Sequence, residues 1–236
     1  MPGCRSIPTT TSSTRSTWAA QDWFARGTIG DIGYVSITSL DELSPSGDED
    51  EDRTAANAAM EQLMGDLDST SGLVVDIRAN GGGWDAVALD VARWFAGPRT
   101  LAWSERHRNG PEHDDFSPWE DVDVRAAVNG AYAGPVVLLT SGGTFSAAET
   151  FALAMRVRDD VTVIGERTSG HFSDLLEAEL PNGWHYTFSG ERYRAADGMI
   201  YEARGVPVDV AVELDVAALA SDRDVMLEAA LARLGR

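Results

Sequence analysis

The 236-residue sequence contains no lysine, so arginine supplies all 19 of its basic side chains. Any mechanism that needs a lysine amine is therefore excluded, including a Schiff base, a serine–lysine dyad and the lysine of a phosphate-binding loop. Cysteine is almost as scarce, because Cys4 is the only one. A single cysteine excludes an intrachain disulfide and a cysteine-based metal site.

Long apolar runs are also missing, and none approaches the roughly 20 residues that a membrane-spanning helix needs. The opening stretch MPGCRSIPTTTSSTRSTW is polar and lacks the apolar segment of a signal peptide. We expect residues 1–28 to be a disordered or truncated lead-in, and residues 29–236 to form the folded core. Apolar residues make up 43 % of the sequence, which is enough to build that core.

Positive charge is scarce relative to negative charge, and the formal net charge is −19. This balance argues against nucleic acid as a partner. The acidic runs at 47–53 and 112–123 are typical of solvated loops. His107, His113 and the aspartates after His113 do not have the spacing of a metal site, so we expect no bound metal and no cofactor.

The remaining pattern alternates buried strands with helices. Apolar strands are expected within 32–40, 72–80, 134–140 and 160–165, and helices over 53–67, 84–95, 146–157 and 215–234. Residues 175–190 have the pattern of a hairpin with Asn182-Gly183 at its turn, whereas residues 107–131 are expected to be irregular. Continuous apolar strands between helices indicate an α/β core with a largely parallel sheet covered by helices.

Two glycine turns follow the expected central strands, at 81–83 and 142–143. Ligands of such folds bind at the carboxyl ends of the strands, where both turns are placed. Ser146 stands after the second turn, where a helix begins. It can be a nucleophile exposed by a strand–turn–helix, or simply the first residue of the capping box Ser146-Ala147-Ala148-Glu149.

Four segments, VVDIRANGGG, LLTSGGTFSAAETFA, VIGERTSGH and YEARGVPVDV, occur in this order between residues 31 and 213. Together they resemble the carboxyl-terminal processing, or tail-specific, proteases of serine peptidase family S41. This family also includes the tricorn core and the retinoid-binding repeats. The resemblance implies a ClpP/crotonase-like core and peptide hydrolysis by Ser146. The peptide-binding PDZ domain of many members is not visible in this sequence.

The sequence departs from the family pattern at the general base. Where the processing proteases have a lysine, this chain has His171, and the first expected strand has Ser36 but no histidine of the tricorn type. The late glutamate of the tricorn-like branch is matched by Glu202. The resemblance therefore leaves two arrangements open, and His171 with Glu202 combines parts of both.

The residues themselves agree with a hydrolase. A serine hydroxyl needs a base to take its proton, and imidazole suits that role near neutral pH. It also needs donors aimed at the developing oxyanion; the Ala147 amide and the turn at 81–83 can supply them, and the resemblance favours Gly82. The expected substrate is an extended peptide bound beside a strand.

Two alternatives stay open at this point. The missing lysine agrees with a non-catalytic module that binds an apolar ligand or peptide on the same fold, and a serine nucleophile can also hydrolyse esters or thioesters. Outside this set, Asp76 and Arg78 alternate along a strand and are expected to brace the glycine turn as a buried ion pair.

Overall fold

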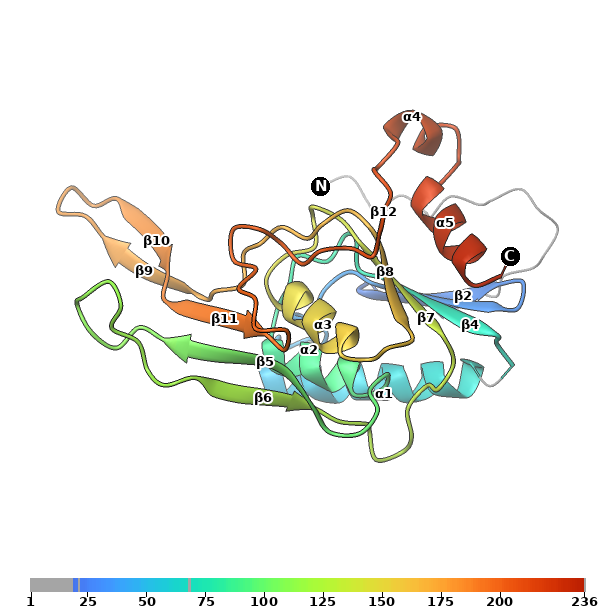
Figure 1. Ribbon diagram of the computed structural model, residues 1–236, viewed down its shortest axis with the longest axis horizontal. Coiled ribbons are helices and arrows are strands. Elements are labelled where there is room, and N and C mark those ends of the chain that lie inside the picture. The colour runs from blue at the N-terminus through green and yellow to red at the C-terminus, as the bar shows by residue number, and fades with distance from the viewer. Residues whose placement is uncertain (1–18, 21, 68, 236) are drawn as a thin grey trace.

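A computed structural model describes residues 19–235 of the chain, except residues 21 and 68 (Figure 1). The part of the expected lead-in up to residue 18, with Cys4, lies outside the described residues.

The centre of the molecule is a seven-stranded sheet in the order β1-β2-β3-β4-β7-β8-β12. Its strands are β1 (Ala19–Ala20), β2 (Phe24–Ile29), β3 (Ile32–Ile37), β4 (Gly72–Asp76), β7 (Val136–Thr140), β8 (Val161–Gly165) and β12 (Val210–Ala211). From β3 to β12 every neighbouring pair is parallel, and β1 and β2 add an antiparallel edge. The largely parallel sheet expected from the sequence is confirmed.

Helices cover both faces of this sheet (Figure 1). One face carries α1 (Glu49–Leu67), α2 (Asp85–Ala92) and α3 (Ala147–Arg156), and the other carries α5 (Val225–Arg233), which follows the short α4 (Val216–Leu219). Within the described residues, no helix is both long and apolar enough to cross a bilayer.

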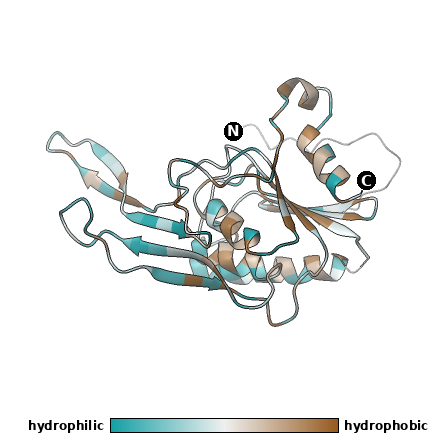
Figure 2. Ribbon diagram, in the orientation of Figure 1, coloured by the Kyte–Doolittle hydropathy of each residue, from teal (hydrophilic) through white to brown (hydrophobic). Residues whose placement is uncertain are grey.

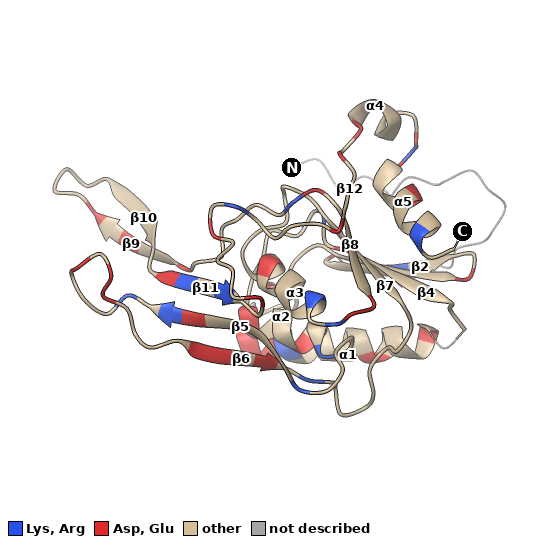
Figure 3. Cartoon of the chain, viewed as in Figure 1, with Lys and Arg blue, Asp and Glu red and all other residues tan. Residues whose placement is uncertain are grey.

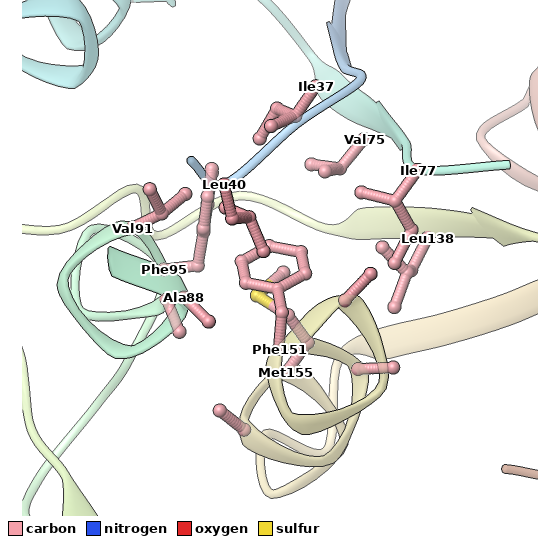
Figure 4. Close-up of a cluster of buried hydrophobic side chains, with 14 of the residues drawn as sticks. Ile37, Leu40, Val75, Ile77, Ala88, Val91, Phe95, Leu138, Phe151 and Met155 are labelled. Atoms are coloured by element: carbon pink, nitrogen blue, oxygen red, sulfur yellow. The ribbon is translucent and has the colours of Figure 1, made fainter. Parts of the chain in front are cut away.

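The main core lies between the sheet and the helices α2 and α3. Figure 4 shows Phe151 and Met155 of α3 packed among side chains of the sheet and of α2. Phe151 is only 1 % exposed, and Val75 and Leu138 of the central strands are fully buried. This packing fixes the first turn of α3 at the carboxyl edge of the sheet, where the expected nucleophile stands.

A smaller antiparallel sheet lies beside the core in the order β11-β5-β6. Its strands are β5 (Thr100–His107), β6 (Glu120–Val124) and β11 (Glu191–Ala195). From the end of this sheet the hairpin of β9 (Leu175–Glu179) and β10 (His185–Ser189) projects away from the body (Figure 1). Gly183 has φ +84° in the hairpin turn, as the Asn-Gly pair predicted.

The hairpin is two-sided, and its apolar side is open to solvent. The register pairs Leu176 with Phe188 and Ala178 with Tyr186, so one face is apolar, while Glu177 and Thr187 share the other. Leu176, Tyr186 and Phe188 are all more than 40 % exposed. Figure 2 shows hydrophobic positions on the hairpin, which projects from the body of the molecule.

The structure differs from the sequence-based expectations at both ends of the chain. Residues 24–28, expected in the lead-in, form most of β2, and the side chain of Phe24 is only 2 % exposed. The single helix expected over 215–234 is instead α4 and α5, because Asp224 ends the intervening turn by capping α5 through the N–H of Leu227.

Two further expectations fail inside the chain. The acidic run at 47–53 is not a loop, since α1 begins at Glu49 and has four acidic residues in its first turn, where they interact favourably with the helix dipole. The stretch 107–131 contains β6, which pairs with β5. Its sequence, EDVDV, does not look like a strand because it is so acidic. A strand tolerates these acidic residues here because only one of its faces meets the core.

Candidate active site

Ser146 occupies a strained turn immediately before α3. Its backbone has φ +55° and ψ −128°, a region that residues other than glycine rarely adopt. Its side chain makes no capping hydrogen bond to the helix. The capping-box interpretation therefore does not account for a serine at this position, and strain of this kind is concentrated at functional sites.

The Glu149 side chain, the other half of the apparent capping box, binds a loop far away in sequence. Its carboxylate accepts hydrogen bonds from Thr168 Oγ1 at 2.5 Å and from the N–H groups of Gly170 and His171, both at 2.7 Å. Glu149 is fully buried, and this burial raises the pKa of its carboxyl although the hydrogen bonds oppose the shift. The carboxyl thus attaches the loop that carries His171 to helix α3.

Backbone hydrogen bonds hold the turn before Ser146 between two loops. On one side, Phe145 N–H donates to the carbonyl of Asn80 at 3.1 Å. On the other side, Ser146 N–H donates to the carbonyl of His171 at 3.1 Å. The expected nucleophile is therefore positioned by the glycine turn and by the loop after β8, two of the segments that the sequence singled out.

Gly82 lies directly against Ser146, as the sequence predicted for its turn. A Cβ added to Gly82, which has φ +100°, would lie 2.7 Å from the Cβ of Ser146 and 3.1 Å from the backbone nitrogen of Ala147. The N–H of Gly82, however, donates to Oδ1 of the buried Asn80 at 2.8 Å. The N–H of Ala147 donates to no acceptor among the described residues, so it is free to bind a ligand.

His171 is exposed beside the turn, and its ring packs against Phe145 with 5.3 Å between ring centroids. Its Nδ1 lies 2.8 Å from Oγ of Ser169. Within the described residues, its ring makes no hydrogen bond to Ser146 Oγ or to Glu202. Glu202 contacts the backbone of the same loop, because its carboxylate accepts a hydrogen bond from the N–H of Phe172 at 3.0 Å.

The structure thus brings Ser146, the glycine turn, His171 and Glu202 into one region. Sequence reasoning missed two supporting residues, Ser169 beside the imidazole and Asn80 beside Gly82. Both stand within the quoted motifs, at TSGH and ANGGG, but their side-chain partners depend on folded loops. No pattern of spacing indicates such contacts.

The expected ion pair between Asp76 and Arg78 is present, with Arg78 Nη2 2.6 Å from Asp76 Oδ2. Arg78 also binds Asp224 at 2.7 Å, which joins the strand end to α5. The carbonyl of Arg78 accepts the hydroxyl of Ser141 at 2.7 Å, in the turn after β7. The network therefore braces the sheet edge on which the candidate site is built.

A half-buried carboxyl also connects α3 to the small sheet. Asp85, at the start of α2, accepts hydrogen bonds from Thr150 of α3 at 2.7 Å and from Tyr193 of β11 at 3.1 Å. Burial raises the pKa of Asp85 to about 6, against the effect of these hydrogen bonds. Nearby, His107 pairs with Glu191 at 2.8 Å. In the part of the chain that the structure describes, no group of three or more histidine, cysteine or acidic side chains is arranged to hold a metal ion.

Comparison with known sequences gives one consistent answer. The model of peptidase family S41 matches residues 31–212. The carboxy-terminal processing protease CtpA of Bacillus subtilis is 25 % identical over 183 residues, which are 78 % of this chain and 35 % of that protein. The chloroplastic C-terminal processing peptidase of Tetradesmus obliquus is 29 % identical over 185 residues, covering 78 % of this chain and 36 % of the relative. The chain spans about a third of the length of these relatives.

Solved structures agree. The structure of a putative peptidase from Parabacteroides merdae superposes with a TM-score of 0.80 at 26 % identity, over 93 % of this chain and 66 % of the other. The photosystem II D1 C-terminal processing protease gives a TM-score of 0.59 at 26 % identity, over 87 % of this chain and 46 % of the other. Mature CPAF complexed with lactacystin has the same fold, with a TM-score of 0.73 over 93 % of this chain and 56 % of the other, at only 11 % identity.

Proposed function

This chain belongs to peptidase family S41, and we propose that it cleaves peptide bonds with Ser146 as the nucleophile. The observation that carries the proposal is the conformation of Ser146. A serine at φ +55° before a helix, with a hydroxyl that caps nothing, has no structural reason to be there. A nucleophile that must project from a sharp strand-to-helix turn explains the same strain.

In the proposed reaction His171 acts as the base. Its imidazole takes the proton from Ser146 Oγ while that oxygen attacks the carbonyl carbon of the scissile peptide. The tetrahedral intermediate then collapses, the carbon–nitrogen bond breaks, and the imidazolium returns the proton to the leaving amine. Water, deprotonated by the same imidazole, hydrolyses the acyl-enzyme and restores the hydroxyl.

The oxyanion hole is proposed to use backbone amides, with Ala147 as its first donor. Its N–H is adjacent to the nucleophile, stands in the first turn of α3 and is free of other acceptors among the described residues. Gly82 is proposed as the second donor because its backbone faces Ser146. Since its N–H is bonded to Asn80, substrate binding must shift or share that hydrogen bond.

The imidazole is proposed to be held by Ser169 rather than by a carboxylate. When Nδ1 carries the proton and donates it to Ser169 Oγ in a hydrogen bond, the lone pair of Nε2 is left to accept the proton of Ser146. Glu202 contributes as a positioning residue, because its carboxylate fixes the N–H of Phe172 next to the base. In this proposal the glutamate acts through the backbone of the loop, not through direct contact with the imidazole.

The proposal is tested with a fluorophosphonate probe, which reacts covalently with an activated serine. We expect labelling of the parent chain and none of Ser146→Ala, with Ser189→Ala of the exposed hairpin as the matched control that still labels. Absence of labelling in the parent would favour the non-catalytic binding module. If the parent labels but cleaves only ester or thioester substrates and no peptide, the chain is a different acyl hydrolase on the same fold.

A further inference from the structure

Arginines gather on the outer face of the small sheet. The register places Arg192 of β11 directly opposite Arg106 of β5, and Arg194 of β11 opposite Ser104. Because side chains alternate along a strand, these arginines share one face, while the buried Tyr193 points to the core. Figure 3 shows their basic positions on β5 and β11 in an otherwise acidic part of the molecule.

Two aromatic rings fix these side chains. The guanidinium of Arg106 lies 4.7 Å from the ring centroid of Phe116 and 4.5 Å from that of Trp119. Arg192 lies 4.4 Å from Phe116, and Arg194 lies 4.3 Å from Trp119. These cation–π contacts hold the guanidinium groups in place, but they neither neutralise the positive charge nor use the N–H donors.

The donors of the opposed pair have no protein acceptors. Among the described residues, Arg106 and Arg192 make no ion pair and donate no side-chain hydrogen bond, and Nε of Arg106 is buried without a partner. Arg194 has one hydrogen bond, to Ser104 at 3.3 Å. Arg108, beyond the end of β5, is different, because its guanidinium binds the carbonyls of its own loop, including that of Glu112 at 2.5 Å.

Among the described residues, no acidic side chain pairs with Arg106, Arg192 or Arg194, although acidic residues dominate the chain. It has 38 acidic residues against 19 basic ones, and elsewhere arginines such as Arg53 and Arg78 pair with buried aspartates. Like charges directly opposite on neighbouring strands destabilise a sheet. Asp121, on the neighbouring strand β6, accepts the hydroxyl of Ser104 at 2.7 Å, and among the described residues it forms no ion pair with any of these arginines.

We propose that Arg106, Arg192 and Arg194 form a binding site for a carboxylate-rich segment of a peptide. Guanidinium groups with unpaired terminal N–H donors match carboxylate oxygens in bidentate geometry. A long polyphosphate chain is the poorer ligand, because so few open cations must act against a net charge of −19. The surrounding charge is screened beyond about 8 Å at physiological salt, so a short acidic segment can still bind.

The site is connected to the candidate active site, and this part of the inference rests on the proposed peptidase function. The N–H groups of Gly190 and Glu191, at the start of β11, both donate to Ser173 Oγ at 3.1 Å. Ser173 follows His171 by two residues in the same loop. The arginines would then act as a second contact for substrates that carry glutamate or aspartate outside the cleaved bond.

Binding is measured apart from catalysis, on the Ser146→Ala variant, by the anisotropy of a fluorescein-labelled hexaglutamate peptide. A hexaglutamine peptide is the control ligand. The test variant adds Arg106→Gln and Arg192→Gln. The matched control adds Arg99→Gln and Arg223→Gln, which change the net charge equally but remove arginines already paired with Asp123 and Glu228.

We expect hexaglutamate, and not hexaglutamine, to bind, and the test variant to weaken binding by about tenfold or more. The control pair is expected to change it less than about threefold, because only screened long-range charge is lost. Arg106→Lys with Arg192→Lys, which keeps the charge but loses the guanidinium geometry, should give an intermediate value. Equal binding of both peptides, or equal losses in the test and control variants, overturns the proposal.

The outcome is separable from that of the proposed function. If hexaglutamate binds as expected but the parent chain does not react with a fluorophosphonate, the arginine site stands and the peptidase proposal fails. If the parent cleaves peptides, an acidic flank should lower KM with little change in kcat, and the Arg106→Gln, Arg192→Gln variant should remove that difference. An active enzyme without that difference contradicts the arginine site as a substrate contact.

Discussion

The backbone N–H of Ser146 donates a hydrogen bond to the carbonyl oxygen of His171. The proposed nucleophile and base are therefore tied to each other through their backbones, before any contact between their side chains. Glu149 strengthens the same link from the buried side, because it binds the N–H of His171 from within α3. A change in the loop after β8 should consequently move both groups together.

Replacement of His171 by Ala should lower kcat by about 10² to 10⁴, the usual contribution of a general base. Ser146→Ala should cost at least as much, and the double variant should be little worse than either single variant, because members of a catalytic unit are not additive. Steady-state kinetics on a peptide substrate check this, with thermal unfolding to confirm the fold. Near-full activity of His171→Ala beside an inactive Ser146→Ala would place the base elsewhere.

Ser169→Ala should reduce kcat by about three- to tenfold, since one neutral hydrogen bond contributes about 0.5–1.5 kcal/mol. KM should change little, because Ser169 is proposed to orient the imidazole and not to bind substrate. Ser169→Thr keeps the hydroxyl and should restore most of the loss. If Thr is no better than Ala, the contact between Ser169 and the imidazole has no part in catalysis.

Gly82→Ala should abolish most of the activity. The new Cβ would lie 2.7 Å from the Cβ of Ser146 and would force an L-residue to φ +100°, at a cost of about 1–3 kcal/mol. Gly81→Ala is the matched control in the same turn, because a Cβ there meets nothing within 4 Å. Fluorophosphonate labelling rates measure the difference. Similar rates for the two variants would mean that the turn can shift to accommodate the new Cβ and that its close contact with Ser146 is not needed for reactivity.

Asp85→Asn should change the pH dependence of stability. Burial raises the pKa of Asp85 in the folded state to about 6, from an ordinary 3.8, so the folded state binds more protons between those values. The contribution of Asp85 to the free energy of unfolding of the parent should therefore fall as pH rises from 4 to 6. Asparagine, which cannot ionise, removes this fall.

The measurement is urea unfolding at pH 4.5 and 7.5. Relative to the parent, Asp85→Asn should gain on the order of 1–2 kcal/mol between the two values, given about 1.4 kcal/mol per pKa unit and partial access to solvent. Asp114→Asn, at an exposed loop position, is the control and should show no such gain. A relative gain with the opposite sign would mean that Asp85 is stabilised as the anion.

The sequence was sufficient for the parts of the site that follow from strand order. Parallel strands end at the same edge of a sheet, so the turn at 81–83 and the helix start at Ser146 had to meet there. Continuous apolar strands and the Asn182-Gly183 turn were likewise enough to predict the sheet and the hairpin.

The rest depends on contacts between distant residues. Ser-x-x-Glu was compatible with a capping box, yet the carboxylate of Glu149 also accepts hydrogen bonds from Thr168 and from the N–H of His171, 19 and 22 residues further on. The N–H of Gly82 looked available for an oxyanion until the folded turn placed Asn80 against it. β2 escaped notice because its sequence, with Arg26 and Gly27 at its centre, has no local apolar alternation, although its pairing with β3 is regular.

The projecting hairpin should be less stable against local opening than the α/β core. Beyond its base, where Ser173 receives the N–H groups of Gly190 and Glu191, β9 and β10 bond to each other, and Leu176, Tyr186 and Phe188 of their apolar face stay more than 40 % exposed. Two strands without a packed face are marginal in water. The hairpin should therefore open locally while the α/β core stays folded, and its amides should exchange with solvent long before those of β4 and β7. Protease nicking near Asn182-Gly183 would then leave Ser146 and its supporting loops intact.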